Sequence, residues 1–122
     1  MKNDYPETVK LAQEAIEEKQ GRDTRIYDVR GKSTITDYFM ITSAASSPQL
    51  KAISESVRVD LKKHGIRDHR MGGTPDSGWI VLDYMDVVIH LFLQETREYY
   101  SIEELWAVED PSDLPAPPAP QS

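Results

Sequence analysis

Residues 78 to 92 read GWIVLDYMDVVIHLF, and this stretch decides the fold. Two runs rich in β-branched and aromatic residues, 79–84 and 87–92, are separated only by Met85 and Asp86. Such runs on either side of a two-residue connection are typical of a β-hairpin. The sequence therefore predicts two antiparallel strands joined by a tight turn.

Alternation of side chains along each strand divides the predicted hairpin into an apolar face and a mixed face. The apolar face carries Ile80, Leu82, Tyr84, Val87, Ile89 and Leu91, and the mixed face carries Trp79, Val81, Asp83, Val88, His90 and Phe92. We expect the apolar face to be core. The mixed face has two explanations that the sequence leaves open: a helix covers it, or it binds another protein through its large aromatic side chains.

The elements on either side of the hairpin complete an α/β domain. Apolar residues at three-and-four spacing predict helices, and short apolar or alternating runs predict strands. The expected helices are Thr8–Lys19, Pro48–His64 with Ser47 as its N-cap, Glu95–Tyr100 and one that starts at Ser101; the expected strands are Thr24–Val29, Asp37–Thr42 and Ile66–Met71, with a loop over Gly72–Gly78. This order predicts a single domain, residues 1–109, with a mixed sheet of about five strands flanked by helices. The proline-rich residues 110–122 are expected to be disordered.

The charge of the chain is negative and concentrated at one end. The net charge is −7, and residues 93–122 hold seven acidic side chains and one basic one. Such a field attracts a basic protein and repels phosphate backbones, so we expect little direct contact with nucleic acid. A solubilising tail is the other explanation. No apolar run approaches the length of a membrane span, the start of the chain is polar, and there is no cysteine, so we expect a cytoplasmic protein without a membrane contact.

Candidate catalytic residues are few. Asp83, Asp86 and His90 form the one group that resembles an acid–base or metal site, but Asp86 is expected at the turn and only one imidazole is near. A polar arrangement that stabilises the hairpin end explains these residues as well. The serines of residues 43–47 precede a helix without the glycines and lysine of a phosphate loop, and Ser47 reads as a cap. We therefore expect no enzyme activity, no metal and no cofactor.

Three motifs resemble the ribosomal silencing factor (Iojap) family. Residues 37–49 read DYFMITSAASSPQ, residues 78–92 read GWIVLDYMDVVIHLF, and residues 95–106 read ETREYYSIEELW. All three are similar to the family's motifs, in the family's order, across roughly Thr8 to Ala107. The chain departs from the family at Met85, where a glycine is usual, and at Gly72-Gly73, where Glu-Gly is frequent. A tight turn there needs positive φ, so Met85 is expected to be strained and exposed unless the turn differs.

The resemblance implies a fold like that of nucleotidyltransferases without their catalytic carboxylates, and a bacterial translational repressor. Family members bind ribosomal protein L-fourteen on the large ribosomal subunit and block joining of the small subunit when nutrients are short. An assembly factor at the same site is an alternative, and a nucleotide-binding enzyme is a weaker one. The expected contact residues are Trp79 as aromatic anchor, Asp83, Tyr84, Met85, Asp86, His90, Tyr99 and Tyr100. A homodimer that shields the same surface is a further expectation.

Overall fold

The computed structural model describes residues 5–31, 36–68 and 70–100, with the backbone alone for Tyr99 and Tyr100. Its elements, in chain order, are α1 (Glu7–Glu18), β1 (Arg22–Asp28), β2 (Tyr38–Ala44), α2 (Ser47–Lys63), β3 (Arg70–Thr74), β4 (Trp79–Asp83), β5 (Val87–Leu93) and α3 (Gln94–Tyr100). The helix expected from Ser101 and the proline-rich tail lie outside the described residues. In the described ranges, no helix combines the length and apolar character needed to cross a membrane.

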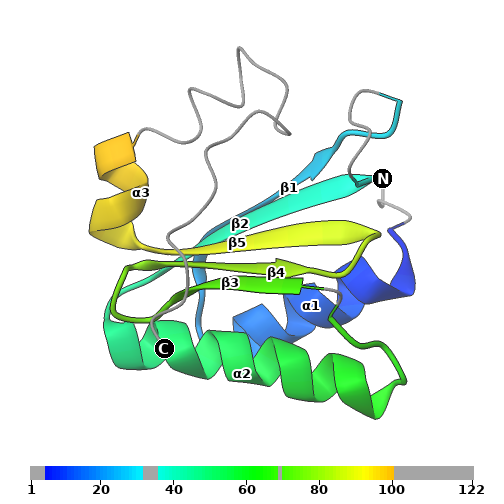
Figure 1. Cartoon of the computed structure of the whole chain (residues 1–122), viewed down its shortest axis with the longest axis horizontal. Coiled ribbons are helices and arrows are strands. Elements are labelled where there is room, and N and C mark those ends of the chain that lie inside the picture. Colours follow the sequence, from blue (N-terminus) through cyan, green and yellow to red (C-terminus); the bar gives the residue numbers. More distant parts are fainter. Residues whose placement is uncertain (1–4, 32–35, 69, 101–122) are drawn as a thin grey trace.

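The strands form one five-stranded mixed sheet in the order β1-β2-β5-β4-β3. The central pair, β2 and β5, is parallel, and every other neighbouring pair is antiparallel. Helices α1 and α2 lie along one face of the sheet, and α3 lies on the other side (Figure 1). The predicted α/β class and the mixed sheet of about five strands are confirmed.

The two faces of the hairpin pack into separate hydrophobic clusters. The apolar face joins the main core under α1 and α2, whose hairpin members are Ile80, Leu82, Tyr84, Val87, Ile89 and Leu91. The opposite face contributes Trp79, Val88 and Phe92 to a second cluster with Val29, Phe39 and Ile41. Cross-strand pairs Trp79–Phe92, Val81–His90 and Asp83–Val88 put the mixed-face residues side by side, as alternation predicted.

Helix α2 follows the predicted apolar stripe, with a small correction at its start. Leu50, Ile53, Val57 and Leu61 are all buried against the sheet. Ser46, rather than Ser47, is the N-cap, because its side chain accepts a hydrogen bond from the Gln49 amide at 3.2 Å. Ser47 is therefore already helical, which moves the boundary by one residue.

Strand β3 lies further along the chain than predicted. The sequence placed a strand over Ile66–Met71 and a loop from Gly72, whereas the strand runs from Arg70 to Thr74 and pairs with β4 throughout. Gly73 is at φ +80°, and a Cβ added there would lie 1.9 Å from the Trp79 carbonyl oxygen. The glycines permit a close backbone approach in a strand, and treating them as loop residues was wrong.

Candidate functional site

The hairpin tip, Met85 and Asp86, is strained and partly apolar. Met85 has φ 72° and is 64% exposed, as its departure from the family's glycine predicted. The Asp86 amide donates to the Tyr84 carbonyl at 2.7 Å, which is the i to i+2 bond of a γ-turn centred on Met85. A methionine at positive φ costs about 1–2 kcal/mol relative to a relaxed backbone, so the turn holds an apolar side chain in solvent at a cost to stability.

Polar contacts from α1, from β2 and from the segment that precedes β2 hold the tip in place. The Thr36 hydroxyl donates to the Met85 carbonyl at 2.8 Å, and the Tyr38 amide donates to the Asp86 carbonyl at 3.2 Å. The Thr8 hydroxyl of α1 donates to the Asp86 carboxylate at 3.5 Å. These hydrogen bonds restrain the backbone on which Met85 is exposed. No signal in the sequence pointed to Thr8 or Thr36, because both lie far from the hairpin along the chain.

Asp83 stabilises the same turn. Its carboxylate accepts the Met85 amide at 2.9 Å and lies 4.0 Å from the Arg70 guanidinium. The Asp83 side chain is only 16% exposed, so the carboxylate lies at the edge of the tip. The expectation that these aspartates structure the hairpin end is confirmed.

An aromatic cluster of Trp79, His90, Phe39 and Phe92 fills the mixed face. The Trp79 indole donates to Nδ1 of His90 at 3.1 Å, and its ring centroid lies 4.9 Å from that of Phe92. The imidazole stacks with Phe39 at 5.9 Å and with Phe92 at 6.1 Å. Because Nδ1 accepts a hydrogen bond, it carries no proton in this arrangement. The cluster therefore depends on a neutral imidazole.

Burial lowers the pKa of His90 to about 3. The unfolded chain, with an ordinary pKa of about 6.5, binds a proton that the folded protein excludes. The contribution of the neutral His90 to stability is thus fully present above pH 6.5 and is lost as pH falls toward 3. We expect His90 to account for a loss of about 2 kcal/mol in unfolding free energy between pH 7 and pH 5.

Urea titrations at pH 7, 6 and 5 measure this dependence. In His90→Asn, the amide oxygen can replace Nδ1 as acceptor and does not titrate. The slope of unfolding free energy against pH should therefore be smaller than in wild type. His64→Gln, at an exposed histidine, should keep the wild-type slope. Equal slopes in wild type and His90→Asn would contradict a buried neutral imidazole.

Tyr84 is buried on the core face, beneath the hairpin tip. Its hydroxyl has no hydrogen-bond partner among the described residues. Burial raises the pKa of Tyr84 to about 12, Asp68 adds to the increase, and Arg58 opposes it. The phenol is therefore a neutral core group within electrostatic range of the Arg58–Asp68 pair.

The structure corrects the placement of three expected contact residues. Trp79, Tyr84 and His90 are each 5% exposed or less: Tyr84 belongs to the main core, Trp79 to the second cluster, and His90 stacks with Phe39 and Phe92. Trp79 is therefore not a surface residue in this structure, and its role in a partner contact stays a prediction. Met85 and Asp86 are exposed. The Tyr99 and Tyr100 side chains lie outside the described residues.

Helix α3 is tied to the sheet by a buried arginine that the sequence did not single out. Arg97 is 6% exposed, and its guanidinium donates to the Ser43 hydroxyl at 2.7 Å, at the end of β2. The sequence suggests for Ser43 only a place in a possible phosphate cradle. Its hydroxyl instead helps to fix α3 against the sheet.

The described residues do not assemble a metal site. In residues 5–31, 36–68 and 70–100, no three histidine, aspartate or glutamate side chains converge to hold a metal ion. His90 faces the aromatic cluster, while Asp83 and Asp86 bond to the turn and to Thr8.

Known proteins match this architecture and these motifs. A family model described as "Ribosomal silencing factor during starvation" matches residues 2–122. The chain belongs to the ribosomal silencing factor family. Ribosomal silencing factor RsfS of Bacillus subtilis is 33% identical over 106 residues, which cover 87% of this chain and 90% of that protein.

Other relatives of this silencing-factor chain include a solved structure and an organellar protein. A crystal structure of a Chromobacterium violaceum protein superposes with a TM-score of 0.78 at 34% identity, covering 90% of this chain and 92% of that one. A mouse protein named "Mitochondrial assembly of ribosomal large subunit protein 1" is 33% identical over 97 residues, covering 76% of this chain and 42% of that protein. The names of the silencing-factor relatives describe regulators of the ribosome rather than enzymes.

Proposed function

We propose that this silencing-factor chain represses translation in the bacterial cytoplasm by binding the large ribosomal subunit through ribosomal protein L-fourteen. The bound chain would block joining of the small subunit sterically, without catalysis and without a cofactor. The main support for this contact is the hairpin tip, where the exposed Met85 is held at positive φ between Asp83 and Asp86.

The chemistry of the tip suits a basic protein surface with an apolar patch. Burying Met85 in an interface gains roughly 1.5–3 kcal/mol. Asp86 places negative charge beside Met85, which favours lysines and arginines on the partner and hastens the encounter. The net charge of −7 favours a basic partner in general. In the absence of ribosomes, a second copy of the chain could shield the same tip as a homodimer.

A role in assembly of the large subunit is the alternative, and the name of the mouse relative favours it. An assembly factor would use the same contact on an immature subunit. The two functions differ in one measurement: a silencing factor inhibits joining of mature, purified subunits, whereas an assembly factor alone binds precursors and leaves joining unchanged.

Met85→Gly tests the proposed contact. Glycine relieves the positive φ, so the unfolding free energy should rise by about 1–2 kcal/mol. Loss of the apolar side chain should weaken association with large subunits by roughly tenfold or more. Urea unfolding and co-sedimentation with purified large subunits measure the two quantities. Opposite changes in stability and binding separate a contact residue from a structural one.

Lys51→Ala is the control, because Lys51 is an exposed residue of α2 outside the hairpin tip. It should sediment like wild type. Undiminished binding of Met85→Gly would remove the tip from the interface. Wild-type chain that binds large subunits without inhibiting subunit joining, measured by light scattering, would favour the assembly role.

A further inference from the structure

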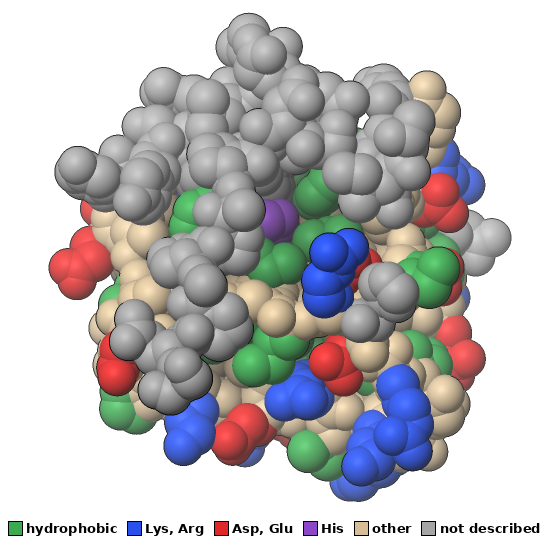
Figure 2. Space-filling model, viewed as in Figure 1, with side chains coloured by type: hydrophobic (Ala, Val, Ile, Leu, Met, Phe, Trp, Pro, Cys, Tyr) green, Lys and Arg blue, Asp and Glu red, His purple; other side chains and the backbone are tan. Residues whose placement is uncertain are grey.

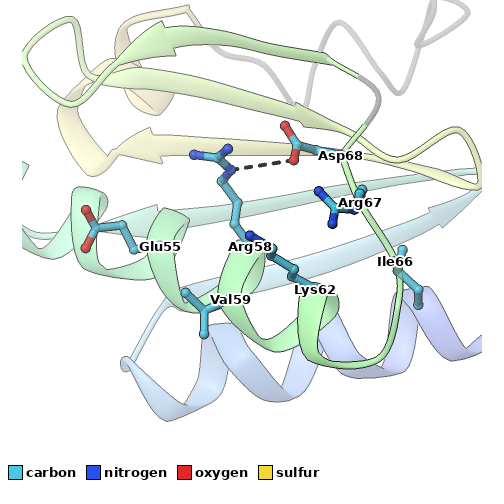
Figure 3. A pocket seen from close by; sticks show the side chains of 7 residues that line it. All are labelled: Glu55, Arg58, Val59, Lys62, Ile66, Arg67 and Asp68. Atoms are coloured by element: carbon cyan, nitrogen blue, oxygen red, sulfur yellow. Dashed lines mark ion pairs between the residues drawn. The ribbon is translucent and has the colours of Figure 1, made fainter.

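An open pocket of about 490 Å³ lies beside the C-terminal half of α2. Its walls are one side of α2 and the connection that leads to β3 (Figure 3). The lining combines apolar surface from the exposed Val59 and the half-buried Ile66 with the cations Arg58, Lys62 and Arg67 and the acids Glu55 and Asp68. Its size falls within the range of pockets that bind small ligands.

The pocket is a locally basic region of an acidic protein. Residues 58–70 hold five lysines and arginines and two carboxylates, in a chain whose net charge is −7. Lysine and arginine side chains gather over the C-terminal end of α2, at the lower right of the molecule (Figure 2). A positive region of this kind attracts anions that the rest of the surface repels.

Two of the pocket's cations are available to a ligand. Arg58 is engaged by Asp68, at 3.7 Å. Lys62 and Arg67 form no ion pair with any described residue, and both are exposed. Glu55 lies apart from the cations, toward the start of α2 (Figure 3); seven residues of helix separate it from Lys62, or about 10 Å along the axis. Most of its effect on an anion at Lys62 is therefore screened at physiological salt.

Helix capping accounts for only part of this charge. Lys62 and Lys63 lie in the last turn of α2, where cations stabilise the helix dipole. Arg67 lies beyond the helix end and cannot act in that way. Arg67 lines the same pocket as Lys62, from the connection that leads to β3 (Figure 3).

We propose that this pocket binds a single nucleotide unit, with the phosphate between Lys62 and Arg67 and the base against Val59 and Ile66. Lysine and arginine are the ordinary protein ligands of phosphate. The apolar wall provides contact area for a planar base. The unit can come from a free nucleotide or from an unstacked residue of RNA, which present the same phosphate and base. The proposal does not depend on ribosome binding through the hairpin tip.

Titration of the ¹⁵N-labelled full chain with adenosine 5′-monophosphate tests the proposal. The expected result is saturable amide shifts confined to residues 55–68. Inorganic phosphate and adenosine, tested separately, should each bind more weakly than the nucleotide. The double variant Lys62→Ala/Arg67→Ala should weaken nucleotide binding by roughly tenfold or more.

The control variant Arg25→Ala/Lys51→Ala removes two positive charges at exposed positions outside the pocket. It should bind the nucleotide like wild type. Equal weakening in both variants, or no shifts within residues 55–68 for either ligand source, would overturn the proposal. A short single-stranded RNA assigns the source: loss of RNA binding in Lys62→Ala/Arg67→Ala identifies RNA, and nucleotide binding without RNA binding identifies a free nucleotide.

Discussion

Trp79→Glu is expected to unfold most of the protein, because the indole is 4% exposed and occupies the aromatic cluster. Truncating a buried tryptophan alone costs about 3–5 kcal/mol, and a buried, unpaired carboxylate adds several kcal/mol more. The Nδ1 acceptor of His90 would also lose its donor. The total approaches the whole stability of a small domain, about 5–15 kcal/mol. Far-UV circular dichroism and urea unfolding at pH 7 measure the loss.

Trp79→Phe separates the two contributions of the indole. Phenylalanine keeps most of the ring packing against Phe92 and loses the hydrogen bond to His90, so we expect a destabilisation of about 1–3 kcal/mol. Folded Trp79→Phe should still co-sediment with large subunits, since the side chain is not at the surface. A folded Trp79→Glu variant that fails to bind would instead restore Trp79 as a surface anchor.

Gly73→Ala is expected to destabilise the sheet by about 4 kcal/mol or more. The new Cβ would lie 1.9 Å from the Trp79 carbonyl oxygen and 3.1 Å from Cα of Ile80. Both neighbours are backbone atoms of β4, so relief requires the β3–β4 pair to separate. The positive φ of 80° adds its own cost for alanine.

Gly65→Ala is the matched control for this substitution. Gly65 also has φ +80°, but a Cβ there would meet nothing within 4 Å. Gly65→Ala should lower the unfolding free energy only by the cost of alanine at positive φ, about 1–2 kcal/mol. Guanidinium unfolding of both variants gives the difference directly. Similar losses at the two glycines would show that β3 can move away from β4 at little cost.

Local patterns in the sequence predicted most of the fold. The two-residue connection at Met85 and the alternation around it identified the hairpin and assigned its residues to two faces. The apolar stripe from Leu50 to Leu61 identified α2. These features are readable because periodicity and turn length reflect local geometry. The wrong bounds of β3 have a different cause. Gly73 is needed because the β4 backbone lies close to it, and the residues next to Gly73 in the sequence do not show this contact.

The candidate site was predicted less well, for a related reason. Strand alternation placed Trp79 and His90 on one mixed face, but their exposure depends on what packs against that face. The structure buries both and leaves Met85 and Asp86 at the surface. The hydrogen bonds from Thr8 and Thr36 to the tip join residues distant in the chain. The sequence shows what a residue can do chemically, whereas its neighbours decide whether a partner can reach it.

The order of the strands also constrains how the chain can fold while it is being synthesised. The central parallel ladder joins Tyr38 to Val87 and ends at Ala44 and Leu93. Pairs β1–β2 and β3–β4–β5 join strands that follow one another and need only short loops to close, whereas β2 must wait for β5, roughly fifty residues later. The inner edge of β2 thus stays open until Leu93 has left the exit tunnel. This member of the ribosomal silencing factor family therefore completes its sheet only when nearly the whole domain has emerged from the ribosome that synthesises it.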